Sequence, residues 1–464
     1  MTTATLAPAL EQNTLNALRS SIRGNVITRE HANYDEVRSV YNGMIDRYPL
    51  LIVQCRNTAD VIACVKFGRD NNLLTSIRGG GHNAGGLGVC DDGLVIDLSL
   101  MRSTRVDPKN NTVRAEGGCL LGDIDHATQP FGKAFPTGIF STTGIAGLTL
   151  GGGLGHLSRA YGLTIDSLLE ADIVLADGSL VTASERENAD LFWAIRGGGG
   201  NFGVVTSFLF KLHDAGAVYA GPMLWHLEDG VKMMKYYRDF ILKAPKELYC
   251  YFAWLTVPPV DIFPKELQLK KMCGLVWCNV GDMDKAAKAV DQFRNYNKPA
   301  LDWVGPMPYS SLQSLFDPLF PKGLQWYWKA DFIKDLPDQS IEVNFKHANK
   351  MPTAQSTMHL YPINGACHEM KNTDTAFGYR DANWSQVIVG IDPDPNKRDE
   401  ITRWAKDYWS DIHPLSAGGA YVNFMMEEGD DRVKASYGKN YDRLLKIKKK
   451  YDPTNFFRVN QNIR

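Results

Sequence analysis

The sequence predicts an α+β fold in two parts, a mixed first half and a second half built on an antiparallel sheet. At 464 residues the chain is longer than one simple hydrophobic core supports, which favours two domains. Strand-like runs between residues 50 and 130 are joined by both hairpins and helical crossovers, a mixture typical of α+β proteins. After about His213, strand-like runs alternate with helices and carry most of the tryptophans.

The spacing of apolar residues divides the first half into helices and strands. Apolar residues at helical spacing predict helices over residues 14–24, 35–46, 61–70, 121–129 and 190–195. Capping residues from Asn57 to Asp60 precede the third of these helices. Apolar and β-branched runs predict strands over residues 49–54, 74–78, 93–98, 105–107, 112–116 and 204–211. The two short strands on either side of residues 108–111 form a hairpin.

The second half is expected to form an antiparallel sheet with helices on one face. Strand-like runs cover residues 248–257, 275–280, 326–332, 357–362 and 384–391. An amphipathic helix is predicted over residues 398–410 and a basic helix over residues 442–450.

The composition excludes several functional classes. A formal net charge of −1 with 22% charged residues argues against nucleic acid or an anionic membrane as the main partner. No apolar run approaches the length of a membrane span, and Met1 to Gln12 lacks the features of a secretory signal. The eight cysteines are scattered, so we expect reduced thiols, a cytoplasmic location, and neither a disulfide scaffold nor a metal site.

Three glycine-rich blocks stand out in the first half, at residues 79–86, 138–155 and 197–203. Successive backbone N–H groups in such loops can bind the pyrophosphate of a dinucleotide without a cationic side chain. Glycine-rich turns can also simply let strands cross closely, and for a single block the two readings are equally favoured. Three blocks together favour loops that converge on one extended ligand.

The third block contains a dinucleotide fingerprint in the wrong setting. Gly198, Gly200 and Gly203 match the pattern GxGxxG. The Rossmann site requires a strand before this pattern and a helix after it, but here a helix precedes and a strand follows. A nicotinamide site is therefore disfavoured, and no P-loop pattern occurs.

Four segments resemble one flavoprotein family. They are residues 78–83, 144–155, 199–205 and 451–462, which include the runs RGGGHN, GGNFGVV and YDPTNFFRVNQN. In this order they resemble the berberine-bridge-enzyme branch of the vanillyl-alcohol-oxidase family. The resemblance implies a two-part FAD-binding domain of that type, formed by residues 1–212 and 416–464, with an antiparallel-sheet substrate domain covered by helices inserted as residues 213–415.

The resemblance also implies how FAD is held. The motif histidine, here His82, bonds the 8α-methyl group of the flavin, although a histidine taken alone is most often a turn or surface residue. Many members add a second bond from a cysteine, but Phe140 stands near that position and no cysteine lies between Cys119 and Cys250. We therefore expect FAD linked covalently through His82 only.

The same resemblance, with the three blocks, implies the cofactor-binding residues. They are Arg78, Gly79, Gly80, Gly81, His82, Asn83, Gly85, Gly86, Ser141, Thr142, Thr143, Gly144, Gly147, Gly152, Gly153, Gly155, Gly200, Asn201, Gly203, Val204, Val205, Asn460 and Gln461.

Three residues are candidates for the chemistry. Tyr421 and Asn423 occupy alternate positions of an expected strand and would face the flavin together, with Tyr421 as the first candidate for the base. The interpretation of Tyr421 as an ordinary structural tyrosine on a strand is equally good. By resemblance, Thr143 lies close to flavin N5, where it would matter if the protein formed a flavin N5-oxide.

The sequence indicates fewer features of the substrate-binding residues than of the cofactor-binding residues. Aromatic residues on a sheet are more often core than pocket, and no clear counterpart of the family's acidic base occurs, because Met358 or His359 stands near that place. The candidate substrate residues are Trp254, Trp328, Lys329, His359 and Tyr361.

The expected function is that of an FAD-linked oxidase. A small organic alcohol, amine, sugar or phenolic, polyketide-like substrate would transfer a hydride to flavin N5, and molecular oxygen would be reduced to hydrogen peroxide. Two alternatives stay open: a flavin N5-oxide oxygenase, and a flavoprotein that binds a ligand without catalysis.

Overall fold

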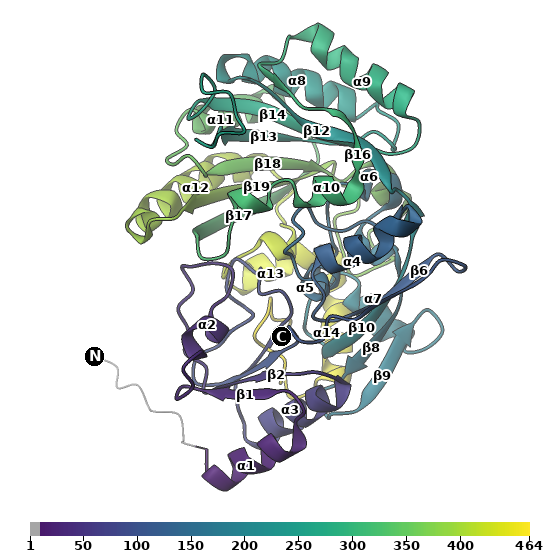
Figure 1. The fold of residues 1–464 in the computed structure, drawn as a ribbon, viewed down its shortest axis with the longest axis vertical. Coiled ribbons are helices and arrows are strands. Elements are labelled where there is room, and N and C mark those ends of the chain that lie inside the picture. Colours follow the sequence, from purple (N-terminus) through teal and green to yellow (C-terminus); the bar gives the residue numbers. More distant parts are fainter. Residues whose placement is uncertain (1–9) are drawn as a thin grey trace.

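The computed structural model describes residues 10–464 and confirms the α+β fold (Figure 1). An eight-stranded sheet with its helices occupies one end of the molecule, and two smaller sheets occupy the other. The expectation for Met1 to Gln12 falls mostly on residues 1–9, outside the described residues. Within the described part of the chain, every helix is too short or too polar to serve as a membrane span.

The first small sheet has four strands in the order β1-β2-β4-β3, of which β2, β4 and β3 are parallel. Its strands are β1 (Asn25–Thr28), β2 (Leu51–Gln54), β3 (Thr75–Arg78) and β4 (Leu94–Asp97). The helix α3 (Thr58–Asp70) crosses from β2 to β3, and the Asn57 side chain caps it by accepting from the Asp60 N–H at 3.0 Å. The glycine turn at residues 79–86 leaves the end of β3, next to β4.

The second small sheet has five antiparallel strands in the order β5-β6-β10-β8-β9. They are β5 (Thr104–Asp107), β6 (Thr112–Glu116), β8 (Leu168–Val174), β9 (Leu180–Ser184) and β10 (Val204–Lys211). The predicted hairpin and the predicted strand over residues 204–211 are confirmed. A separate pair joins β7 (Lys133–Ala134) to β11 (His213–Asp214).

Short helices surround these sheets. They are α1 (Gln12–Ser21), α2 (Tyr34–Arg38), α4 (Leu121–Thr128), α5 (Ile145–Gly151), α6 (Ser158–Tyr161) and α7 (Ala189–Ile195). The predicted helix over residues 35–46 is wrong beyond Arg38, because the chain turns extended at Ser39 and the Tyr41 N–H donates to the Gly81 carbonyl oxygen. The second glycine block, expected as a loop, contains α5.

The eight-stranded sheet is antiparallel, in the order β15-β12-β14-β13-β18-β19-β17, with β16 paired to β12. The strands are β12 (Ala217–His226), β13 (Cys250–Thr256), β14 (Lys271–Asn279), β15 (Leu301–Asp302), β16 (Gly305–Pro308), β17 (Gln325–Ile333), β18 (Thr357–Pro362) and β19 (Trp384–Asp392). The helices α8 (Gly230–Ile241), α9 (Met283–Tyr296), α11 (Asp338–Ala348) and α12 (Arg398–Ile412) gather at this end of the molecule (Figure 1). Side chains of α8, α11 and α12 share one core with one face of the sheet.

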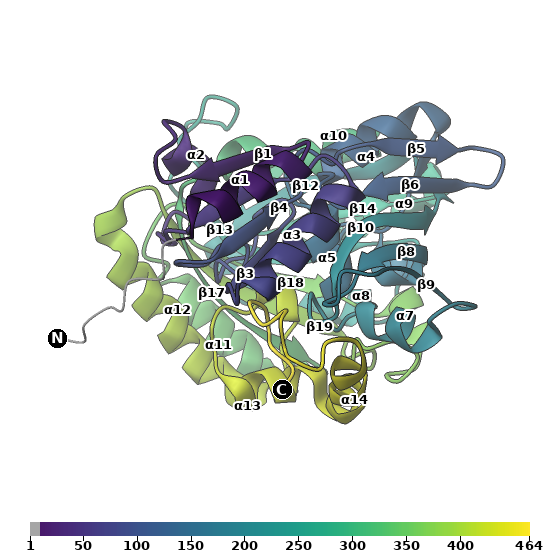
Figure 2. The same cartoon turned by 90° about the horizontal axis from the view of Figure 1, so that it is seen from below.

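The C-terminal segment returns to the first half of the chain. Helices α13 (Asp430–Tyr437) and α14 (Tyr441–Tyr451), yellow in Figure 2, lie with the tail beside the smaller sheets. Lys448 Nζ donates to the carbonyl oxygen of Asn201 at 2.7 Å, and the Ile463 N–H donates to Asn201 Oδ1 at 3.1 Å. The tail thereby completes the two-part fold, while the exact boundaries after residues 212 and 415 stay a prediction. The short helix α10 (Tyr309–Ser314) lies next to α4.

Candidate active site

A cavity of about 280 Å³ lies between the inner face of the eight-stranded sheet and the loops of the smaller sheets. Residues of all three glycine blocks line it, together with the C-terminal tail and strands β17, β18 and β19. Segments far apart in the sequence therefore meet at one internal space.

The glycines of this wall are needed for two different reasons. A Cβ added to Gly80 would lie 2.4 Å from the backbone nitrogen of Gly144, so the first two blocks touch through their backbones. A Cβ added to Gly147 or Gly200 would meet no described atom within 4 Å and would extend into the open space. The second pair therefore leaves room for a ligand along the glycine wall.

Free backbone donors line the same wall. Within residues 10–464, no backbone carbonyl accepts from the N–H groups of Gly79, Gly80, Gly81 and His82. Gly81 has a φ of +69°, a left-handed conformation that glycine adopts without strain and that occurs in loops whose successive N–H groups bind anions. The row of donors fits a pyrophosphate group, the central anion of FAD.

His82 lies in this row with its imidazole held on two sides. Its ring stacks on Tyr41, with 3.9 Å between the ring centroids. Burial lowers the pKa of His82 to about 4, although a hydrogen bond to the backbone of Thr142 raises it. The imidazole is therefore neutral at pH 7, and a neutral imidazole that donates through one nitrogen keeps a lone pair on the other.

Arg78 is buried beside the attachment loop and is already paired. Its guanidinium donates to Asp97 at 2.7 Å, and the two side chains are 7% and 2% exposed. The pair joins the ends of β3 and β4, so it fixes the point where the glycine turn begins.

Phe140 lines the cavity, and its ring meets the edge of Phe320 with 5.6 Å between the centroids. The eight cysteines are all buried and free, and none of them lines the cavity within the described residues.

The C-terminal tail closes the opposite side of the glycine wall. Asn460 Nδ2 donates to the carbonyl oxygen of Gly200 at 3.0 Å, while its Oδ1 is buried without a partner among the described residues. Gln461 Nε2 donates to the carbonyl oxygen of Met426 at 3.1 Å. The tail therefore brings polar side chains to the cavity wall.

Tyr421 and Asn423 do meet, but the expected strand is wrong. Residues 422–424 form a turn of 3₁₀ helix, which brings Asn423 Nδ2 within 2.7 Å of the Tyr421 oxygen. The Gly153 N–H donates to the same oxygen at 2.9 Å. Burial raises the pKa of Tyr421 to about 12, although both hydrogen bonds lower it. Tyr421 is therefore a neutral phenol whose oxygen already accepts two hydrogen bonds.

Most of the expected site residues border the cavity. Those that line it are Arg78, Gly79, Gly80, Gly81, His82, Asn83, Thr143, Gly144, Gly147, Gly200, Gly203, Val205, Trp328, His359, Tyr361, Tyr421, Asn423, Asn460 and Gln461. Those that do not line it are Gly85, Gly86, Ser141, Thr142, Gly152, Gly153, Gly155, Asn201, Val204, Trp254 and Lys329.

Two of the residues that do not line the cavity have clear reasons for their position. Ser141 turns away because its hydroxyl donates to Asp317. Val204 belongs to a separate core, since it precedes Val205 on a strand and neighbouring side chains point to opposite faces. The expectation that these residues touch the cofactor does not fit their position.

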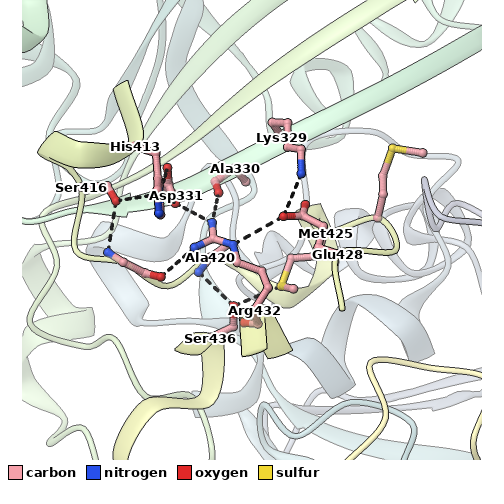
Figure 3. Close-up of polar contacts among 12 residues, drawn as sticks. Lys329, Ala330, Asp331, His413, Ser416, Ala420, Met425, Glu428, Arg432 and Ser436 are labelled. Carbon is pink, nitrogen blue, oxygen red and sulfur yellow. Dashed lines mark hydrogen bonds and ion pairs between the residues drawn. The ribbon is translucent and has the colours of Figure 1, made fainter. Parts of the chain in front are cut away.

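Two of the candidate substrate residues point away from the cavity. Trp254 packs into the core under the helices, where its ring lies 2.3 Å from the site of a Cβ on Gly230. Lys329 follows Trp328 on β17 and faces the other side of the sheet, where its Nζ lies 3.0 Å from Glu428 (Figure 3). Neither residue can meet a substrate in the cavity.

Several aromatic and aliphatic residues that line the cavity, four of them on the sheet, were not predicted from the sequence. They are Tyr41, Phe320, Trp326, Val387, Val389 and Ile391. Trp326 stands two positions from Trp328 on β17, and the three aliphatic residues alternate along β19. The period of two could have identified these four strand residues once a single cavity-facing residue of each strand was known.

His359 and Tyr361 form a hydrogen-bonded pair on β18. His359 Nδ1 lies 2.5 Å from the Tyr361 hydroxyl oxygen, and both side chains line the cavity. Burial lowers the pKa of His359 to about 3, so its imidazole is neutral at pH 7. The pair faces the glycine wall from the opposite side of the cavity.

Comparison with known proteins relates two parts of the chain that line this cavity to known families. Residues 49–184 match the FAD binding domain family, and residues 420–464 match the berberine and berberine-like family. An FAD-linked oxidoreductase of Dictyostelium discoideum is 32% identical over 455 residues, which cover 97% of this chain and 96% of that protein.

Two solved structures share the fold. The 6-hydroxy-D-nicotine oxidase of Arthrobacter nicotinovorans has a TM-score of 0.86 at 25% identity and covers 96% of this chain and 98% of its own. The glucooligosaccharide oxidase of Acremonium strictum, which carries a 6-S-cysteinyl, 8α-N1-histidyl FAD, has a TM-score of 0.84 at 24% identity, with 97% and 98% covered.

Proposed function

This chain belongs to the berberine-bridge-enzyme-like branch of the vanillyl-alcohol-oxidase family of FAD-linked oxidoreductases, and we propose that it is an oxidase of a small organic molecule that releases hydrogen peroxide. The observation that carries the proposal is the single cavity that joins the glycine wall to an aromatic sheet wall. A substrate on the sheet wall would lie against a cofactor held by the glycine wall. When bound, FAD accepts two electrons from the substrate.

His82 is the proposed attachment point, as the only covalent link. Its neutral imidazole lies on the cavity wall, fixed by Tyr41 and by the backbone of Thr142. The aromatic ring of Phe140 and the absence of a lining cysteine among residues 10–464 support a single link. The Acremonium enzyme differs, since its FAD is also cysteinyl.

The other residues of the glycine wall would hold FAD without covalent bonds. The free N–H groups from Gly79 to His82 would bind its pyrophosphate, and the unpartnered Oδ1 of Asn460 would accept a hydrogen bond from an N–H or O–H group of the cofactor. Tyr421 and Asn423 would act by fixing this wall, because their hydrogen bonds tie them to Gly153 and to each other.

Acid precipitation of the purified protein tests the covalent link. The wild type is expected to keep its yellow colour in the pellet, and the variant His82→Ala is expected to release it into the supernatant. The variant His31→Ala, on an exposed turn, is the matched control and should behave like the wild type. Free flavin from the wild type would refute the link, as would bound flavin in His82→Ala.

Peroxide release tests the oxidase reaction. Alcohols, sugars, amines and phenols are offered to the holoenzyme, and peroxide is expected in proportion to the substrate consumed. The runner-up is an oxygenase, favoured by the position of Thr143 on the cavity wall. Substrate loss without peroxide, with labelled oxygen from O₂ in the product, would favour that alternative. Binding of a ligand without peroxide release and without oxygen incorporation would favour a non-catalytic flavoprotein.

The cytoplasmic location stays a prediction.

A further inference from the structure

Tyr41 lies on the cavity wall in direct contact with His82. Its ring stacks on the imidazole with 3.9 Å between the centroids and 19° between the planes. No side chain of residues 10–464 shares a hydrogen bond with that imidazole, whose hydrogen bond goes to the backbone of Thr142. The orientation of the imidazole therefore depends on the Tyr41 ring and on this backbone contact.

Three hydrogen bonds hold Tyr41 between two distant segments. Its N–H donates to the carbonyl oxygen of Gly81 at 3.0 Å, on the glycine turn that carries His82. The Gly323 N–H donates to the Tyr41 carbonyl oxygen at 3.0 Å, and the Tyr41 hydroxyl donates to the Phe320 carbonyl oxygen at 2.5 Å. Because Phe320 and Gly323 precede β17, the ring is also held from the side of the eight-stranded sheet.

Asn42 ties the same glycine turn to β17. It is 1% exposed, and its Nδ2 donates to the carbonyl oxygens of Ala84 at 2.7 Å and Trp326 at 3.0 Å. Its Oδ1 accepts from the N–H groups of Met44 at 2.9 Å and Trp326 at 3.1 Å. An asparagine amide offers two donors and two acceptor sites, and all four are used here. The turn that carries His82 is thus fixed against the first residues of β17.

The stack with Tyr41 leaves the reactive part of the imidazole free. A stacked contact covers the face of a ring, whereas both imidazole nitrogens lie at the edge. A ring nitrogen bonds through a lone pair that lies in the ring plane, so the plane of the imidazole sets the direction of the bond. A reaction of this kind needs the two atoms aligned at about 3–3.5 Å, and a small displacement slows it strongly.

Resting on the covalent link in the proposed function, we propose that Tyr41 is a positioning residue for the attachment of FAD. Its ring fixes the plane of the His82 imidazole, so that one nitrogen points at the 8α carbon. The bonds of Tyr41 and Asn42 to residues 320–326 make this orientation depend on the docking of the sheet against the glycine turn.

The attachment balances without a charged product. A C–H bond of the 8α-methyl group and the N–H bond of the imidazole break, and one C–N bond forms. The two electrons and two protons that are released pass to molecular oxygen, which becomes hydrogen peroxide. The linked imidazole therefore stays neutral and needs no countercharge in its buried position.

The rate of attachment tests the role of Tyr41. The full chain is produced in a host starved of riboflavin, purified and given FAD in air, and the flavin in acid-precipitated samples is followed over time. Tyr41→Leu, which removes the aromatic face, is expected to form the link about 100-fold more slowly than the wild type. Tyr41→Phe keeps the stack and loses one hydrogen bond, so its rate is expected to lie within about 10-fold of the wild-type rate.

FAD binding separates orientation of His82 from retention of the cofactor. In the His82→Ala background, where no link is expected, quenching of flavin fluorescence gives the Kd of FAD. Adding Tyr41→Leu to that background is expected to leave this Kd nearly unchanged. Tyr34→Leu is the matched control, since Tyr34 is also buried and its hydroxyl donates to the Pro49 carbonyl oxygen at 2.7 Å, but it does not line the cavity. It should form the link at the wild-type rate.

Each contrary result has a distinct meaning. A wild-type rate in Tyr41→Leu would overturn the proposal, and so would equal slowing in Tyr41→Phe and Tyr41→Leu, or in Tyr34→Leu. A loss of FAD affinity as large as the loss of rate would also overturn it, because Tyr41 would then hold the cofactor or the fold. A wild type that never forms the link refutes the link itself and with it this role, while peroxide release from substrates still decides the oxidase function.

Discussion

At the scale of single residues, glycine serves two opposite purposes in the cavity wall. Gly80 is required because the backbone of Gly144 is too close for any side chain. Gly147 lies in α5 with open space beside it, so its lack of a side chain has no structural cause within the described chain. Its role is then to leave room for the cofactor.

The variant Gly147→Leu separates these roles. Leucine is a better helix former than glycine, so the flavin-free chain is expected to gain up to about 1 kcal/mol of stability. The side chain would fill the cavity, so the purified variant is expected to contain much less flavin than the wild type by absorbance. Gly305→Leu, at a site that is also open but on the edge strand β16, is the control and should keep full flavin content. Full flavin content in Gly147→Leu would show that the space beside Gly147 is not occupied by the cofactor.

Asp125 on α4 gives a pH-dependent prediction. Burial raises the pKa of its carboxyl to about 7, although a hydrogen bond from Gln313 lowers it. Between about pH 4 and pH 7 the folded chain holds a proton that the unfolded chain has lost. The contribution of Asp125 to stability is therefore present at low pH and falls as the pH rises through that range.

Replacement by asparagine removes this dependence. Asp125→Asn is expected to gain thermal stability relative to the wild type as the pH rises from 5 to 8, as measured by the midpoint of unfolding. Asp407→Asn, on an exposed position of α12, should show a constant difference over the same range. A constant difference for Asp125→Asn would show that its carboxyl is ionised in the folded protein at pH 5.

At the scale of elements, a buried ionic cluster joins the edge strand β17 to α13 and to Glu428 just before that helix. Arg432 donates to Asp331 and to the carbonyl oxygens of Ala330 and Gly418, and Lys329 pairs with Glu428 (Figure 3). The Asp331 side chain is 2% exposed, and Arg432 is 10% exposed. This cluster holds the chain that follows Tyr421 and Asn423 against the sheet, so it fixes one side wall of the cavity.

Arg432→Met is expected to destabilise the protein strongly, because it leaves the Asp331 carboxylate buried with His413 as its remaining partner. Breaking a buried pair from one side costs about 3–5 kcal/mol. Arg464→Met, which breaks an exposed pair with Asp430, is the control and should cost about 0–1 kcal/mol. Chemical unfolding of both variants measures the difference, and equal small losses would show that the cluster is not structural.

The elements that the sequence predicts best are those with strict local patterns. The strands over residues 204–211 and 357–362 and the helix after Asn57 follow from alternation and capping alone. The helix over residues 35–46 fails because Tyr41 contacts the glycine turn, a tertiary interaction that no local pattern reveals. The period of two shows that Trp328 and Lys329 face opposite sides of β17, but only packing decides which side is the cavity.

At the scale of the whole molecule, the order of four short motifs was enough to predict the family, because three glycine blocks and a C-terminal tail meet at one cavity. The substrate wall was harder to predict, since its aromatic residues look like core residues in the sequence. Trp254 belongs to the core, while Trp326 and Trp328 line the cavity.

The proposed holoenzyme carries one FAD, bonded to the chain through His82 alone. Peptide mass mapping of the denatured, protease-digested protein tests it most directly. A single flavin-bearing peptide is expected, the one that contains His82, with the flavin mass located on that residue by fragmentation. A flavin mass on any cysteine-containing segment, on two peptides, or on none would contradict it.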